Sequence, residues 1–174
     1  MLAPVIAEQS KQLSGIILLA GPTRKLEDLI LEQTEYIYSL KSDISDEEEK
    51  FLTDLRSRID SLKNKTLPPN SQLIGVPASY FYDLANINQV ETAKKLSIPI
   101  LILQGERDYQ VTMEDFNIWT KKLSQHKNVI LKSYPQLNHL FMTGEGKAKP
   151  EEYNLPNSVD IEVIKDIVEW IIRL

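Results

Sequence analysis

Two polar segments, each directly after an apolar run, carry the residues best suited to chemistry. Gln104-Gly105-Glu106-Arg107-Asp108 follows the run that begins at Ile98, and Tyr134-Pro135-Gln136-Leu137-Asn138-His139 follows the run that begins at Val129. If both runs are parallel strands, Asp108 and His139 follow their carboxyl ends, where open parallel sheets place catalytic groups. A carboxylate there can orient an imidazole, which can then take a proton from a hydroxyl. Taken alone, the first segment is a weak signal and is better explained as a charged loop leading into a helix.

The residue types in the chain restrict the nucleophile and the cofactors. There is no cysteine and there are only two histidines, so the nucleophile must be a hydroxyl or a carboxylate, and the chain offers little material for a transition-metal site. Ser79 lacks the flanking glycines of an exposed nucleophile turn, so we discount it. His126 is expected to be a solvated residue at the end of a helix, and Glu145 lies in a polar loop near the predicted site.

The composition of the chain limits the kinds of partner that it can bind. The 174 residues carry a net charge of -5 and a pI near 5.1, the wrong sign for binding a nucleic-acid backbone. No apolar run approaches the roughly 20 residues of a membrane helix, so we expect a soluble protein without a membrane partner. The compartment stays open, with the cytoplasm weakly favoured over export.

Short apolar runs alternate with helical periodicity, which predicts an α/β fold with parallel strands. Strands are expected at Ile16 to Ala20, Ile98 to Gln104 and Val129 to Tyr134. Helices are expected to start after Asn88 and Thr112, each followed three residues later by an acidic residue. A final helix runs from about Asp160 to the end, with Ser158 as a candidate cap.

A helical hairpin is predicted between the first two strands. Apolar residues recur at helical spacing from Thr23 to Lys65, and Ser45 with Glu48 marks the start of the second helix. Residues 66–78 form a linker, so the predicted parts are 1–22, 23–78 and 79–174. After the linker, the aromatic residues Tyr80, Phe81 and Tyr82 are expected to pack the hairpin onto the sheet; alternatively, Tyr80 and Phe81 line a substrate pocket.

The order of Asp108 and His139, and the segments around them, resemble a known family. Residues 105–111 (GERDYQV) and 137–141 (LNHLF) are similar to the acid and histidine motifs of α/β-hydrolases of the dienelactone hydrolase and acyl esterase group. Residues 1–7 resemble the helix that follows the Gly-x-Ser-x-Gly-Gly elbow of that family. The resemblance implies the C-terminal portion of an α/β-hydrolase fold: three parallel strands, flanking helices and a helical-hairpin cap.

The resemblance also implies an activity and a deficiency. In a complete enzyme, a serine just before Met1 would attack a small carboxylic ester, His139 would act as base and then acid, and Asp108 would orient it. The resemblance implies no cofactor, neither a metal nor an organic group. No Gly-x-Ser-x-Gly occurs in this chain, so we expect it to be inactive alone. Because the strand at 16–20 would lie at an open edge, we expect pairing with an N-terminal half or with a second copy. The alternatives are a catalytically silent binding module and a small enzyme that uses a discounted serine.

Overall fold

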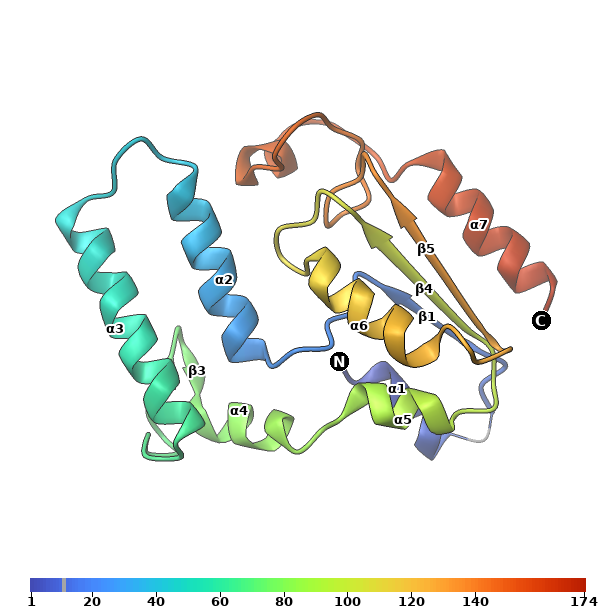
Figure 1. Cartoon of the computed structure of the whole chain (residues 1–174), viewed down its shortest axis with the longest axis horizontal. Helices are drawn as coiled ribbons and strands as arrows, with labels where there is room; N and C mark the ends of the chain where they lie inside the picture. Colours follow the sequence, from blue (N-terminus) through green and yellow to red (C-terminus); the bar gives the residue numbers. More distant parts are fainter. Residues whose placement is uncertain (11) are drawn as a thin grey trace. The chain divides into compact units, whose positions relative to one another are not determined.

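The computed structural model of the chain describes residues 1–10 and 12–174. It divides into two compact units: a sheet unit of Met1–Thr23 with Asn88–Leu174, and a helical unit of Arg24–Ile87 (Figure 1). The helical unit is thus an insertion between the first and second strands of the main sheet.

The sheet unit contains the three parallel strands that the sequence predicts. They are β1 (Ile16–Leu19), β4 (Ile100–Gly105) and β5 (Val129–Tyr134), in the order β1-β4-β5. Pro99 lies just outside β4, where it has no N–H to contribute but its carbonyl accepts from Ile16 N (3.0 Å). Every residue of β4 is buried, which explains why its sequence is almost continuously apolar. The predicted α/β fold with three parallel strands is confirmed.

Helices cover both faces of this sheet. Helices α1 (Ala3–Gln9), α5 (Gln89–Lys95) and α6 (Met113–Leu123) lie on one face (Figure 1). Trp119 of α6 is buried there with Ile100 and Ile102. The opposite face packs against α7 (Ile161–Ile172), chiefly through Val163 and Trp170, and a short 3-10 helix, η1 (Pro150–Asn154), precedes it. Alternate residues of each strand therefore meet different helices.

The helix starts agree only in part with the capping patterns. Asn88 caps α5 as predicted and accepts from Glu91 N (3.0 Å). Thr112 occupies the cap position of α6 without a side-chain cap hydrogen bond, and the backbone N–H of Asp115 donates to the Thr112 carbonyl (3.0 Å). The Asp115 carboxylate bonds outside the helix: its Oδ1 accepts from Thr23 N (2.7 Å) and Thr23 Oγ1 (2.8 Å).

The cap of α7 is Asp160, which accepts from Glu162 N (2.8 Å), so Ser158 as its cap was wrong. Ser158 lies two residues too early to reach the first free N–H groups of the helix.

Near Asp115, the two points where the chain leaves and re-enters the sheet unit are joined. Gln89 Nε2 donates to the carbonyl of Pro22 (3.0 Å), and Gln89 is buried. Together with the Thr23–Asp115 bonds, this contact fixes both ends of the insertion within the sheet unit.

The helical unit begins with the predicted hairpin, α2 (Leu26–Ser39) and α3 (Asp46–Lys63). The predicted capping box at Ser45 is present: Glu48 N donates to Ser45 Oγ (3.2 Å) and Ser45 N to Glu48 Oε2 (3.0 Å). The predicted linker contains a small antiparallel pair, β2 (Gln72–Leu73) and β3 (Val76–Pro77), which turns at Ile74-Gly75, both with positive φ.

Helix α4 (Ala78–Ala85) also belongs to the helical unit, which corrects the boundary predicted between residues 78 and 79. Ala78 and Phe81 are almost completely buried in a cluster with Leu55, Ile59 and Leu73. Because this apolar face of α4 packs on the hairpin, the unit ends at Ile87.

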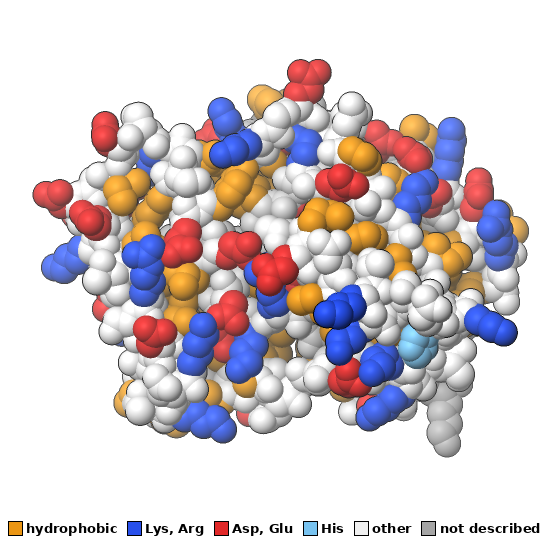
Figure 2. All heavy atoms as spheres, in the orientation of Figure 1, with side chains coloured by type: hydrophobic (Ala, Val, Ile, Leu, Met, Phe, Trp, Pro, Cys, Tyr) orange, Lys and Arg blue, Asp and Glu red, His pale blue; other side chains and the backbone are white. Residues whose placement is uncertain are grey.

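Charged side chains of both signs are interspersed on the face shown in Figure 2. This pattern accords with the small net charge of -5. In the described ranges 1–10 and 12–174, no helix has both the length and the hydropathy needed to cross a bilayer.

Candidate active site

The structure brings Asp108 and His139 into contact at the carboxyl end of the sheet. Asp108 follows β4 and His139 follows β5, and the two strands are neighbours. His139 Nδ1 lies 2.8 Å from Asp108 Oδ2. The Asp108 side chain is completely buried, whereas 27% of the His139 side chain is exposed. The aspartate is thus positioned by protein contacts alone, and the imidazole retains an open side.

The acceptor positions of the Asp108 carboxylate are well occupied. Oδ1 accepts from the backbone N–H groups of Gln110 (2.7 Å) and Val111 (3.0 Å), and Oδ2 accepts from Gln104 Nε2 (3.2 Å). Because the carboxylate is an acceptor, His139 Nδ1 is the donor of their shared bond, and its Nε2 then carries the free lone pair. A histidine in that tautomer can accept a proton from a hydroxyl.

Gln104 supports this arrangement and was not singled out by the sequence analysis. It is the penultimate residue of β4 and is 1% exposed. In addition to Asp108, its amide approaches the carbonyl oxygens of Val111 (2.8 Å) and Gly105 (3.0 Å). It therefore ties the loop that carries Asp108 to the end of the strand. An amide at the end of an otherwise apolar buried strand is the signal that could have revealed it.

Asn138 shapes the loop that carries His139. Its Oδ1 accepts from Leu140 N (3.0 Å) and Met142 N (3.1 Å), and its Nδ2 donates to Glu152 Oε2 (3.1 Å). The turn places Phe141 at φ 57°, an unusual conformation for a bulky residue. The side-chain hydrogen bonds of Asn138 thus hold a tight turn immediately after the histidine.

Gly105 allows that loop to approach β4. A Cβ atom at this position would lie 2.4 Å from the carbonyl oxygen of Leu137 and 2.6 Å from that of Asn138. Only glycine permits two backbone segments to come this close. The glycine at the end of β4 is thus part of what sets the position of His139.

An ion pair secures the surrounding loops. Arg107 Nη2 lies 2.6 Å from Glu152 Oε1, and the same guanidinium donates to the carbonyls of Gly146 (2.8 Å) and Glu145 (3.1 Å). Burial alone would raise the pKa of Glu152, but hydrogen bonds from Arg107 and Asn138 outweigh it and hold this pKa below its ordinary value. The contribution of Glu145 seen here is its backbone carbonyl, within a loop anchored by Arg107.

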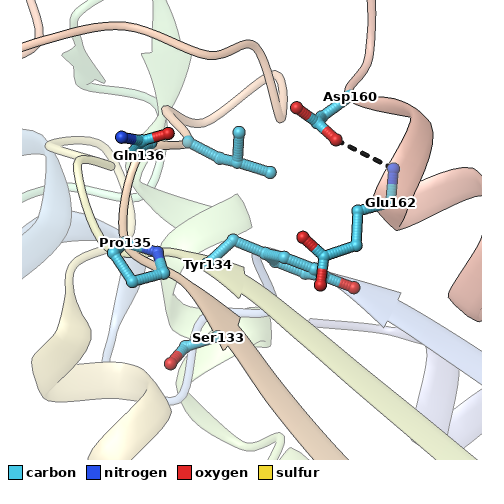
Figure 3. Close-up of a pocket in the computed structure, with 7 residues that line it drawn as sticks. Ser133, Tyr134, Pro135, Gln136, Asp160 and Glu162 are labelled. Carbon is cyan, nitrogen blue, oxygen red and sulfur yellow. Dashed lines mark hydrogen bonds between the residues drawn. The ribbon is translucent and has the colours of Figure 1, made fainter.

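A separate hollow of about 300 Å³ lies at the end of β5 (Figure 3). The hollow lies between the residues that end or follow β5 and the first residues around the start of α7. Its lining residues are Ser133, Tyr134, Pro135, Gln136, Leu137, Asp160 and Glu162. Burial and a hydrogen bond to Asp166 raise the pKa of Tyr134, so its hydroxyl stays protonated. Asp108 and His139 do not line this hollow, so it is distinct from the acid–histidine pair.

The other predicted residues lie on α4 or next to α6. Tyr80 and Phe81 are on α4 in the helical unit, where Phe81 is 1% exposed and Tyr80 is 48% exposed, with their rings edge to face (centroids 6.1 Å apart). Their role in substrate binding stays a prediction. Ser79 is exposed in the first turn of α4, and His126 follows the C-terminus of α6 as expected.

Comparison with known proteins agrees with this architecture. The model of the dienelactone hydrolase family matches residues 73–171, which include both Asp108 and His139. The chain is 42% identical over 173 residues to esterase EstD of Thermotoga maritima; the match covers 99% of this chain and 40% of that protein. The chain therefore spans well under half the length of this relative. The extent of the family match shows that the chain belongs to the dienelactone hydrolase family.

Proposed function

We propose that this chain supplies the histidine and the aspartate of the catalytic triad of a serine-dependent carboxylic ester hydrolase. The observation that carries the proposal is the bond between His139 Nδ1 and the buried Asp108 carboxylate at the ends of two adjacent parallel strands. Family membership and the similarity to an esterase support the same reaction class.

The chemistry follows from the roles of the two residues. His139 Nε2 would accept the proton of a serine hydroxyl as the serine oxygen attacks the ester carbonyl, and would then return it to the leaving alcohol. Asp108 would stabilise the imidazolium formed between these steps. Water, activated by the same histidine, would hydrolyse the acyl-enzyme. The reaction as proposed requires neither a metal nor an organic cofactor.

The serine is the component that must come from elsewhere, since no Gly-x-Ser-x-Gly occurs in these 174 residues. This observation favours a second candidate function, a catalytically silent module that binds a partner or a second copy of itself. The two candidates differ in whether Asp108 and His139 support turnover when a nucleophile is provided.

A chimera tests the proposal. The segment of EstD that matches this chain is replaced by this chain, and hydrolysis of a short p-nitrophenyl ester is measured. We expect turnover that is lost in the His139→Ala chimera, with Ser79→Ala as the control that retains it. A folded chimera without turnover, or one equally active without His139, would support the silent module instead.

A further inference from the structure

One side of the sheet unit combines an open strand edge with an exposed apolar helix flank. We call it the β1–α7 surface; it consists of the outer edge of β1 and an apolar stripe on α7. The stripe residues are 44–78% exposed: Ile161, Ile164, Val168, Ile171 and Ile172. Such a concentration of exposed large apolar side chains on one helix marks an interaction site.

The edge of β1 offers unpaired backbone groups. Ile16 N donates to Pro99 O (3.0 Å) and Ala20 N to Leu103 O (2.9 Å), so alternate residues of β1 face β4. The intervening residues, Ile17 and Leu19, therefore direct their N–H and C=O groups away from β4. Within the described residues, β1 pairs only with β4, so this edge can accept a further strand.

Helical geometry places the stripe on the same side as this edge. Val163, Ile167 and Trp170 face the sheet. The acidic flank of α7 points towards β5, because Lys132 of β5 contacts Asp166 (2.6 Å) and Glu162 (2.8 Å). At 100° per residue, Ile164, Val168 and Ile171 lie on the opposite flank, away from β5. The apolar flank thus faces the side of the sheet that ends at β1.

We propose that the β1–α7 surface binds an α/β polypeptide equivalent to the part of EstD that this chain does not match. That partner would add a strand parallel to β1 and pack an apolar helix against the α7 stripe. EstD includes a counterpart of 99% of this chain and is much longer, so in that protein the corresponding surface shares a molecule with the remaining residues. Parallel sheets are normally covered on both faces, and an apolar strand such as β1 suits an interior position.

A second copy fits this surface less well. Two β1 edges related by a twofold axis would pair antiparallel over a strand of four residues. Each copy also carries a net charge of -5, which opposes self-association. These observations favour the complementary polypeptide, a choice that rests on the proposed function.

Co-expression tests the surface by binding rather than by activity. This chain, with an affinity tag, is produced together with the unmatched part of EstD, and the amount that co-purifies is measured. Leu19→Pro removes an outward N–H without removing a bond to β4, and Val168→Glu places a charge in the stripe. Arg173→Gln is the control. It changes the net charge by the same amount as Val168→Glu, at a side chain that is 73% exposed and lies on the flank opposite the stripe. Tryptophan fluorescence confirms that each variant is folded.

We expect a one-to-one complex whose yield falls about tenfold or more in Leu19→Pro and Val168→Glu and is unchanged in Arg173→Gln. Binding that neither variant weakens would overturn the assignment, as would self-association that both variants abolish without any capture of the EstD part. A complex without ester hydrolysis retains this inference and counts against the proposed function. If the chimera is active but the separated parts do not bind, the proposed function is retained and this inference is overturned.

Discussion

Replacing Gly105 by alanine should test how the sheet positions His139. The added Cβ would lie 2.4 Å from the Leu137 carbonyl oxygen, about 1 Å closer than ordinary contact. That carbonyl also accepts from Arg107 N (3.0 Å), so a shift that relieves the clash also disturbs this bond. Overpacking of this kind against backbone atoms should lower the free energy of unfolding by about 3 kcal/mol, the upper end of its usual range.

Gly146→Ala is the matched control, because it lies in the same group of loops at φ 62° with nothing within 4 Å of a new Cβ. Its cost is the left-handed conformation alone, about 1 kcal/mol. For a chain of this size, the two variants should lower the melting temperature by roughly 6–12 °C and 2–4 °C, respectively.

Urea unfolding followed by tryptophan fluorescence measures this difference. Both tryptophans of the chain, Trp119 and Trp170, are buried in the sheet unit, so the signal reports on the unit that carries the site. If Gly105→Ala loses no more stability than Gly146→Ala, close backbone approach does not determine the position of the histidine loop, and the reasoning is refuted.

Three further predictions concern the site and the helical unit. In the EstD chimera, Asp108→Asn should lower kcat by about 10⁴ without unfolding the protein, because it removes the acceptor that fixes the His139 tautomer; a loss below about tenfold in steady-state kinetics would contradict this role. Glu152→Gln should lower the free energy of unfolding by about 1–2 kcal/mol at neutral pH. The folded-state pKa of Glu152 lies below 4.5, so the stability difference between wild type and Glu152→Gln should be complete above pH 4.5. It should vanish as the pH falls through the lower folded-state pKa, and urea titrations at a series of pH values measure it. Phe81→Ala should destabilise the helical unit by about 3–5 kcal/mol and Tyr80→Ala by less than about 0.5 kcal/mol, measured by limited proteolysis; equal sensitivity would contradict the packing of α4.

The acid–histidine contact could be predicted because the signals for it are local. Apolar runs identified β4 and β5, and a parallel sheet brings the residues after neighbouring strands together without further information. Asp108 and His139 needed only this rule to be placed side by side. The helix start after Asn88 is equally local, since its side chain reaches an N–H three residues away.

The supporting contacts could not be predicted because their partners are distant in the chain. Asp115 has the spacing of a capping residue, but it bonds to Thr23, 92 residues away. Arg107 and Glu152 are separated by 45 residues, and the motif around Arg107 does not identify its partner. The assignment of α4 to the helical unit likewise depends on which surface buries Phe81, and periodicity identifies an apolar face without identifying its partner.

The bonds that join Pro22 to Gln89 and Thr23 to Asp115 have a consequence for how this chain can vary. Both ends of the 64-residue insertion Arg24–Ile87 are fixed by contacts made wholly within the sheet unit. Because closing a loop between fixed ends costs only about 0.6 kcal/mol for each doubling of its length, the insertion can lengthen, shorten or be exchanged with little effect on the strands that carry Asp108 and His139. The helical unit and the geometry of the Asp108–His139 pair can therefore change independently, one through the insertion and the other through the sheet unit.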